Sequence, residues 1–385
     1  MSEGVTLTDI AQDRAIVVCC GAGGVGKTTT AAAFALHAAR LGRKACVVTI
    51  DPARRLANSL GLDALSNRPS QIEGDWPGEL HALMLDPKGT FDDLVRRYAD
   101  TPDQAEGILA NRMYRNLTGA LSGTQEYMAM EKLHELAEEG GFDVVVVDTP
   151  PTRHALDFLD APRRLTSLLN NRFFQVLMMP TRASLKFVGM AAHAMLRTIS
   201  KVAGADVVRD AVTFFQAFAG MEEGFRTRAN RVRELLTLPS TAFILVASPW
   251  PNSVDEAVFF AGKLAESDMS VTALIVNRVQ PRFIDNSRLE QLTAIAGRAT
   301  AEGGALQDLI DNLAGYTVAS DRDERTYGDL VARIAPAPVS RVPLLNTDVH
   351  DLDGLEVIAD LLFLGDGRGA RPSAEAPGEP SQPAS

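Results

Sequence analysis

A glycine-rich segment near the N-terminus has the composition of a phosphate-binding loop. Residues 21–28 read Gly-Ala-Gly-Gly-Val-Gly-Lys-Thr and fit the pattern G-x-x-x-x-G-K-[ST], between an apolar run and a helical pattern. Glycines let backbone N–H groups converge on phosphate oxygens, and the following helix offers its positive end. Lys27 would reach the β- and γ-phosphates, and the Thr28 hydroxyl would bind Mg²⁺. The pattern therefore predicts a nucleoside triphosphate site. A glycine-rich turn with an incidental lysine and a dinucleotide-binding loop are the alternatives.

Two aspartates follow apolar runs that have the character of strands. Asp148 ends the run 144–147 and is a candidate Walker-B carboxylate that holds Mg²⁺ directly or through water; a plain strand-end cap is the alternative. Asp51 ends the run that follows the predicted loop helix. At the carboxyl edge of a parallel sheet its carboxylate could orient the attacking water, and it could also cap a helix that starts near Pro52.

The elements that would position these residues alternate between strand and helix patterns. Five β-branched-rich runs lack polar alternation, as expected for strands covered on both faces: 15–20, 45–50, 143–148, 241–247 and 271–276. Helical patterns at 28–41 and 255–267 lie between them. The alternation predicts an α/β fold with a doubly wound, mostly parallel sheet.

Helical segments interrupt this pattern. We expect an N-terminal extension over 1–13 and one P-loop ATPase domain over 14–364, with a helical subdomain formed by 92–138 and 160–238. Residues 365–385 are rich in Pro, Gly, Ser, Ala and Glu, which is typical of a disordered tail.

Composition excludes several functional classes. The formal net charge of −11 argues against general nucleic-acid binding. The cysteines Cys19, Cys20 and Cys46 lie in apolar runs, too few for a disulfide framework or a four-cysteine zinc site, and we expect them in the core. No signal peptide or membrane-spanning stretch is evident, so we expect a cytoplasmic protein.

The motifs together resemble a known family. Gly-x-Gly-Gly-Val-Gly-Lys-Thr-Thr is similar to the deviant Walker A motif of the SIMIBI-class ATPases, which include the MinD and ParA proteins. Asp51-Pro52-Ala53 and the segment 148–156 resemble switch I and switch II of the arsenite-pump ATPase (ArsA) family, which includes the eukaryotic ATPase that delivers tail-anchored membrane proteins. Residues 122–126 resemble the short motif upstream of switch II.

The resemblance assigns roles to individual residues. It implies ATP and Mg²⁺ as cofactors and a nucleotide-dependent dimer. The catalytic residues would be Asp51, as the water-positioning base, and Lys27. Thr28 and Asp148 would serve Mg²⁺, and Asn277 in Val276-Asn277-Arg278 would read adenine. Pro343 would lie in the loop that closes the adenine pocket. The nucleotide-binding set is then Gly23, Gly24, Val25, Gly26, Lys27, Thr28, Thr29, Asn277 and Pro343.

The chain departs from the family pattern at three points. The signature lysine of the loop, which reaches the phosphates of the partner subunit, is replaced by Ala22. Arg54 or Arg153 could compensate, a paralogue could supply the lysine, or hydrolysis could be slow. The Cys-x-x-Cys zinc motif of the eukaryotic dimer is absent from the sequence, and so are the metalloid-binding cysteines of the arsenite pump.

A basic and apolar segment is the candidate client or membrane face. Residues 161–205 carry seven basic and no acidic side chains. The apolar candidates are Phe173, Phe174, Met178, Met179, Phe187, Met190 and Met195, and methionine-rich surfaces suit variable apolar clients. The alternative is a packed helical subdomain with a solvated basic face.

Three functional hypotheses remain open at this point. The first is a dimeric ATPase, cytoplasmic or peripheral at the membrane, whose cycle handles a hydrophobic client, a membrane protein or a transport partner. The second is a regulatory subunit with weak ATPase activity that pairs with a signature-lysine paralogue, which Ala22 favours. The third is a MinD/ParA-like positioning ATPase, against which the long helical insertion argues.

Overall fold

The computed structural model describes residues 5–50, 55–62, 64–112, 114, 124–150, 161, 163, 166–167, 170, 213–214, 217, 221–296 and 304–363. Asp51, both proposed compensating cations and all seven residues of the proposed client face lie outside the described residues. The residues concerned are Asp51, Arg54, Arg153, Phe173, Phe174, Met178, Met179, Phe187, Met190 and Met195. The tail 365–385 also lies outside them.

An eight-stranded sheet forms the centre of the described structure, in the order β3-β4-β2-β5-β1-β6-β7-β8. The strands are β1 (Ile16–Gly21), β2 (Lys44–Thr49), β3 (Ser70–Ile72), β4 (Glu79–Met84), β5 (Val144–Asp148), β6 (Thr241–Ala247), β7 (Val271–Val279) and β8 (Val339–Pro343). Only the edge strand β3 runs antiparallel to its neighbour; the other pairs are parallel. The predicted α/β class with a mostly parallel sheet is confirmed.

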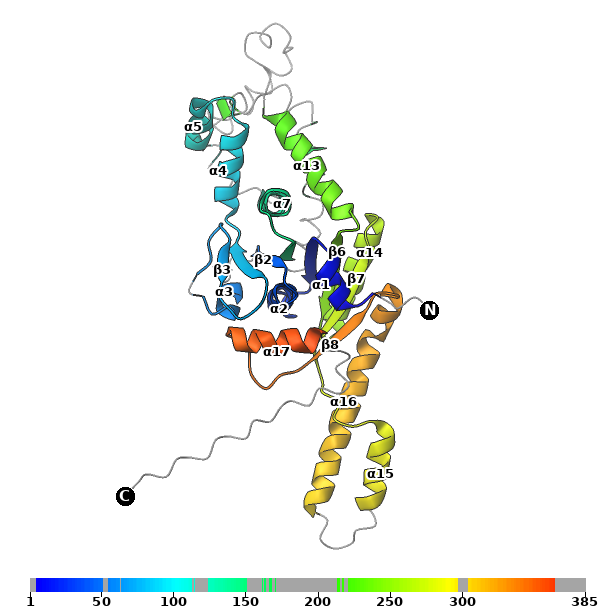
Figure 1. Ribbon diagram of the computed structural model, residues 1–385. Helices are drawn as coiled ribbons and strands as arrows, with labels where there is room; N and C mark the ends of the chain where they lie inside the picture. Colours follow the sequence, from blue (N-terminus) through cyan, green and yellow to red (C-terminus); the bar gives the residue numbers. More distant parts are fainter. Residues whose placement is uncertain are drawn as a thin grey trace, which may run out of the picture.

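Helices cover both faces of the sheet (Figure 1). One core joins the sheet to α1 (Leu7–Asp13), α2 (Lys27–Arg40), α3 (Arg55–Ser59) and α17 (Leu352–Phe363). The other joins it to α7 (Thr124–His134), α13 (Glu222–Thr237), α14 (Pro251–Glu266) and the end of α16 (Gly304–Ile334). Along β5, Val144 and Val146 enter the first core, whereas Val145 and Val147 enter the second. Burial on both sides explains why the strand sequence shows no polar alternation.

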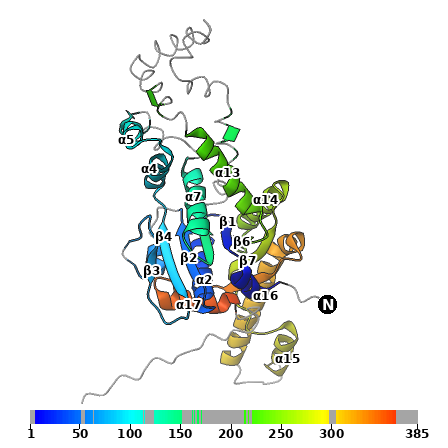
Figure 2. The same ribbon diagram turned by 45° about the horizontal axis from the view of Figure 1, so that its top comes forward.

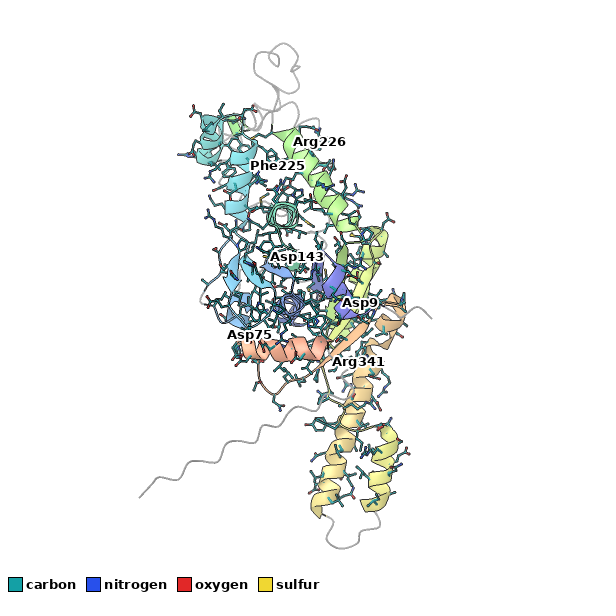
Figure 3. All side chains as sticks on the ribbon, viewed as in Figure 1. Asp9, Asp75, Asp143, Phe225, Arg226 and Arg341 are labelled. Atoms are coloured by element: carbon teal, nitrogen blue, oxygen red, sulfur yellow. The ribbon has the colours of Figure 1, made fainter. Side chains whose placement is uncertain are left out.

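A helical layer rises from the carboxyl side of β4. It contains α4 (Pro87–Tyr98), α5 (Pro102–Ala110), α7 and α13, and it has a hydrophobic core of its own. Phe225 of α13 lies in this core, with its ring 5.4 Å from that of Tyr98 (Figure 3). The described residues of the stretch predicted to be helical, 92–138, are helical except at 99–101 and 111, and a π-helix over Glu135–Glu139 leads from α7 toward β5.

A helical hairpin projects at the opposite end of the molecule from α4 and α5, as both ribbon views show (Figures 1 and 2). It consists of α15 (Asn286–Ala296) and the first half of the 31-residue helix α16. The second half of α16 packs on the sheet through Tyr327, Leu330 and Ile334. Exposed apolar side chains gather on and beside the hairpin: Phe283, Ile295, Leu306, Leu309, Tyr316 and Val318. The sequence patterns used above did not predict this hairpin.

Candidate functional site

The glycine-rich loop joins the end of β1 to the start of α2. Gly24 and Gly26 have left-handed backbones, with φ of +77° and +95°, which side chains disfavour. A Cβ atom on Gly26 would lie 2.3 Å from Asn277 Nδ2, so this glycine is also required by close packing. Because α2 begins at Lys27, the loop N–H groups and the positive helix end lie together. This is the strand–loop–helix context that the motif requires.

The Lys27 ammonium group is folded onto the loop. Its Nζ donates to the carbonyl oxygens of Gly21 at 3.0 Å and Ala22 at 2.8 Å, and the residue is 7% exposed. The positive charge therefore lies inside the curve of the loop, where an anion would bind. Ala22 is buried, and its methyl group offers no charge to a ligand or a partner subunit.

Two hydroxyl groups converge on the carboxylate of Asp148. The Thr28 hydroxyl donates to Asp148 Oδ2 at 2.7 Å, and the Thr49 hydroxyl donates to the same oxygen at 2.9 Å. Hydroxyl and carboxylate oxygens are the ligands that Mg²⁺ prefers. The donor set therefore fits the predicted ion, and the assignment of Thr28 and Asp148 as its ligands stays a prediction. Thr49 was not predicted; its signal was its position at the end of β2, next to β5.

The three cysteines are buried and free, as expected from their apolar runs. Burial raises the pKa of Cys20 and of Cys46 to about 12. Burial, followed by the charge of Asp148, raises the pKa of Cys19 as well. Neutral buried thiols are poor metal ligands. Within the described ranges, no group of three or more His, Cys, Asp or Glu side chains could hold a metal ion.

The end of β7 contacts the loop directly. Asn277 Nδ2 donates to the Val25 carbonyl oxygen at 2.8 Å, and Asn277 Oδ1 accepts from the Arg278 N–H at 2.9 Å. Pro343 at the end of β8 pairs in register with Val279 of β7. The structure thus brings Asn277, Pro343 and the loop to one region of the sheet edge. The adenine-reading role of Asn277 stays a prediction.

Arg278 is a residue of this site to which the sequence motifs assign no role. Its Nη1 donates to the Gly24 carbonyl oxygen at 3.2 Å. Its backbone is left-handed, with φ of +63°, at a register irregularity between Asn277 and Val279. The neighbouring asparagine was noticed because it matched a family motif, whereas no pattern in the sequence marks a bulge.

A buried ion pair joins the helices above the sheet. Arg228 of α13 donates to Glu131 Oε2 at 2.5 Å and to Glu139 Oε1 at 3.1 Å. Glu131 is 1% exposed, and burial raises its pKa. Tyr127 donates to the same carboxylate, which supplies a further polar partner. Because the π-helix continues into the segment before β5, this network connects the helical layer to the strand that ends in Asp148.

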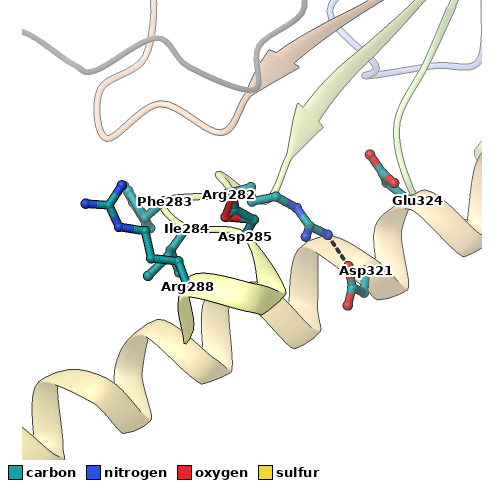
Figure 4. Close-up of a pocket in the computed structure, with 7 residues that line it drawn as sticks. All are labelled: Arg282, Phe283, Ile284, Asp285, Arg288, Asp321 and Glu324. Atoms are coloured by element: carbon teal, nitrogen blue, oxygen red, sulfur yellow. Dashed lines mark hydrogen bonds and ion pairs between the residues drawn. The ribbon is translucent and has the colours of Figure 1, made fainter. Parts of the chain in front are cut away.

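A cavity of about 780 Å³ lies beyond Arg278, between the β7–α15 connection and α16 (Figure 4). Its lining is Arg282, Phe283, Ile284, Asp285, Arg288, Asp321 and Glu324. Arg282 pairs with Asp321, whereas the Arg288 guanidinium points away from that pair. The lining mixes both signs of charge, so it does not have the character of an anion site.

Comparison with known proteins decides the family. The model of the family described as anion-transporting ATPase matches residues 14–312. The chain belongs to this family. Membership confirms the resemblance to the arsenite-pump ATPase family that the sequence motifs indicated.

Several curated relatives of this chain are named ATPase GET3. The protein of Aspergillus terreus is 31% identical over 150 residues, which is 39% of this chain and 43% of the relative. The protein of Malassezia globosa is 30% identical over 166 residues, 43% of this chain and 48% of the relative. The matched segment spans somewhat less than half the length of these relatives. None of the described helices has the length and hydrophobicity needed to cross a bilayer.

Proposed function

We propose that this family member hydrolyses ATP and uses the nucleotide cycle to handle a hydrophobic or membrane-protein client, in the cytoplasm or peripherally at the membrane. The observation that carries the proposal is the convergence of Lys27, Thr28 and Asp148 at one edge of the sheet. The family match and the relatives named ATPase GET3 support the choice of ATP. The apolar client, such as the membrane anchor of a tail-anchored protein, follows from the resemblance to a family that includes the ATPase delivering such proteins.

Each residue of the site has a proposed role in binding or hydrolysing ATP. Lys27 and the loop N–H groups bind the β- and γ-phosphates, and α2 adds its positive end. Thr28 and Asp148 would hold Mg²⁺, directly or through water, and the ion would supply positive charge that offsets the charge of the phosphates. Asp51 orients the attacking water, and Thr29, Asn277 and Pro343 complete the nucleotide pocket.

We further propose that the protein works as a dimer. A homodimer and a heterodimer with a paralogous ATPase are both compatible with the family resemblance. The buried alanine at position 22 favours the second, because a paralogue with the signature lysine would restore the missing charge. In that case the chain alone binds ATP and turns it over slowly.

Steady-state hydrolysis and ATP binding by the purified chain test these proposals. Clear turnover that Lys27→Ala abolishes would support a self-sufficient ATPase. Tight ATP binding without turnover, rescued by Ala22→Lys, would support the regulatory subunit. Failure of the parent chain to bind Mg·ATP would contradict the nucleotide site itself.

The client is tested with a fluorescent peptide that carries a single apolar C-terminal anchor. We expect capture of the peptide to depend on ATP and to weaken when Phe173, Met178 and Phe187 are replaced by Ser. Phe259→Ser is the matched control, because Phe259 is an exposed phenylalanine on α14 and is not part of the proposed client face. Equal loss in both variants, or no loss in either, would contradict the proposed client face.

A further inference from the structure

Two neighbouring side chains at the end of β7 hold two neighbouring carbonyl groups of the loop. Asn277 Nδ2 donates to Val25 O at 2.8 Å, and Arg278 Nη1 donates to Gly24 O at 3.2 Å. Both donors approach from the same short segment of backbone. The third contact, from Arg278 N–H to Asn277 Oδ1 at 2.9 Å, fixes the two donors relative to each other.

Peptide geometry gives these contacts a consequence for anion binding. In a trans peptide the C=O and the following N–H point in opposite directions. The carbonyl of Gly24 shares its peptide with the N–H of Val25, and the carbonyl of Val25 shares its peptide with the N–H of Gly26. Holding both carbonyls from the β7 side therefore turns both N–H groups to the other side, into the loop where phosphate oxygens bind.

The left-handed backbone of Arg278 carries a conformational cost, which indicates that the arrangement of the two donors is maintained at the expense of local stability. Arg278 and Asp268 are the non-glycine residues of the described chain with positive φ, at +63° and +59°. Arg278 also lies at the register irregularity in which Asn277 pairs with Val342 and Val279 pairs with Pro343. Bulges of this kind redirect a side chain, and strained residues concentrate at functional sites.

The positive charge of Arg278 has no acidic partner in the described structure. No carboxylate of the described residues forms an ion pair with its guanidinium, and the side chain is exposed. By contrast, Arg40, Arg228 and Arg282 each pair with an acidic side chain. A guanidinium directed at a peptide carbonyl polarises that peptide, which strengthens its N–H as a donor to an anion.

We propose that Asn277 and Arg278 form a carbonyl clamp, a pair of positioning residues that preorganises the loop for the phosphates of the nucleotide. The proposal rests on the proposed binding of nucleotide phosphates by this loop. In this proposal Asn277 acts by holding the loop backbone. Its substitution should therefore weaken the binding even of phosphate ligands that have no base. Preorganisation lowers the cost of binding because the N–H groups are already aligned.

Tripolyphosphate, which has the phosphates of ATP without base or sugar, separates the clamp from base recognition. We expect Arg278→Gly and Asn277→Ala each to weaken binding of ATP, ADP and tripolyphosphate by a similar factor of about ten. Arg278→Lys should recover part of the affinity because it restores a donor and a charge. Isothermal titration calorimetry of the full chain measures all three ligands.

Thermal unfolding without ligand shows whether these losses come from a damaged fold. Arg278→Gly should unfold at the parent temperature or above, because glycine accepts a positive φ. Asp268→Gly is the matched control: it removes the same type of strain on the exposed turn after α14 and should leave phosphate binding unchanged. Arg288→Ala, an exposed arginine of α15, controls for the loss of one positive charge.

Three results would overturn the clamp. Parent-like binding of tripolyphosphate by Arg278→Gly and Asn277→Ala would contradict it. Loss of ATP binding with retained tripolyphosphate binding in Asn277→Ala would assign that side chain to the base instead. A lower unfolding temperature of Arg278→Gly with unchanged affinity would make Arg278 a purely structural residue. A parent chain that binds tripolyphosphate but not ATP would contradict the proposed function and leave the clamp intact.

Discussion

The Thr28 hydroxyl lies 2.7 Å from Asp148 Oδ2, although 120 positions separate the two residues in the chain. The contact exists because β1 and β5 are hydrogen-bonded neighbours in which Cys19 pairs with Asp148. The loop after β1 must therefore return past the end of β5. This relationship brings the two proposed Mg²⁺ ligands into direct contact.

Asp148→Asn should remove the dependence of ATP binding on Mg²⁺. The amide keeps the hydrogen bonds to hydroxyl groups but loses the charge that attracts the cation. We expect hydrolysis to fall by about 100-fold, since charge stabilisation on the phosphates is lost. Titration of ATP affinity with Mg²⁺ measures the change. Thr49→Ser, which keeps the hydroxyl, is the control, and an unchanged Mg²⁺ titration in Asp148→Asn would contradict the assignment.

Gly26→Ala should damage the loop more than Gly24→Ala. Both residues have positive φ, so each substitution costs roughly 1 kcal/mol in backbone strain. Only at Gly26 would the new Cβ meet an atom, Asn277 Nδ2 at 2.3 Å, whereas a Cβ on Gly24 would meet nothing within 4 Å. Chemical denaturation and ATP titration of the two variants provide the comparison. Equal losses would show that the contact with Asn277 is unimportant.

Glu131→Ala should destabilise the protein by about 3 kcal/mol or more, because it leaves the buried Arg228 without its closest partner. Arg231→Ala on the same helix is the matched control. Arg231 is exposed and contacts Glu138 at 3.3 Å, so its loss should cost much less than the loss of Glu131. Urea denaturation measures both values. A small effect of Glu131→Ala would mean that Glu139 alone satisfies Arg228.

His37 should make the protein less stable in mild acid. Burial, together with the nearby charge of Arg40, lowers the pKa of His37 from 6.5 to about 4. Its ring stacks on Phe363 of α17, with 3.6 Å between the ring centroids. Between these two pKa values the unfolded chain binds a proton that the folded chain excludes, so the free energy of unfolding falls as pH falls from 6.5 toward 4.

The size of this effect is up to about 3 kcal/mol, and the partial exposure of the ring reduces it. Denaturation of His37→Phe between pH 7 and pH 4 should show a flatter profile than the parent chain. His350→Gln, which alters an exposed histidine, is the control and should follow the parent. A parent-like slope in His37→Phe would assign the acid sensitivity to other groups.

The central strands could be predicted because their sequences have a single explanation. An uninterrupted run such as Val144–Val147 requires burial on both faces, and both cores contain alternate residues of it. The loop was equally predictable, because the positive φ at Gly24 and Gly26 favours glycine. The strands and the loop could therefore be predicted because burial and backbone conformation restrict the residue types at their positions.

The elements that were missed depend on partners distant in the sequence. β8 is a short edge strand with an arginine in its middle, and Arg341 is placed by the Tyr327 hydroxyl of α16 at 3.1 Å (Figure 3). β4 alternates polar and apolar residues only from Glu79 to Ala82, before the apolar Leu83 and Met84. The position of Arg278 beside Gly24 follows from a bulge and from the β1–β6–β7 order, neither of which a single sequence reveals.

The continuous helix α16 has a mechanical consequence. Its inner half is anchored on the sheet, and Asp323 accepts a hydrogen bond from the Gln280 N–H at 2.8 Å, two residues after Arg278. From Asp323 to Gly304 the helix extends about 28 Å outward. The helix can therefore act as a rigid lever, because its inner half is attached through Asp323 and Gln280 close to the glycine-rich loop. Each degree of rotation about that point displaces the outer end by about 0.5 Å, so a force applied to the hairpin and a small shift of the loop are mechanically linked.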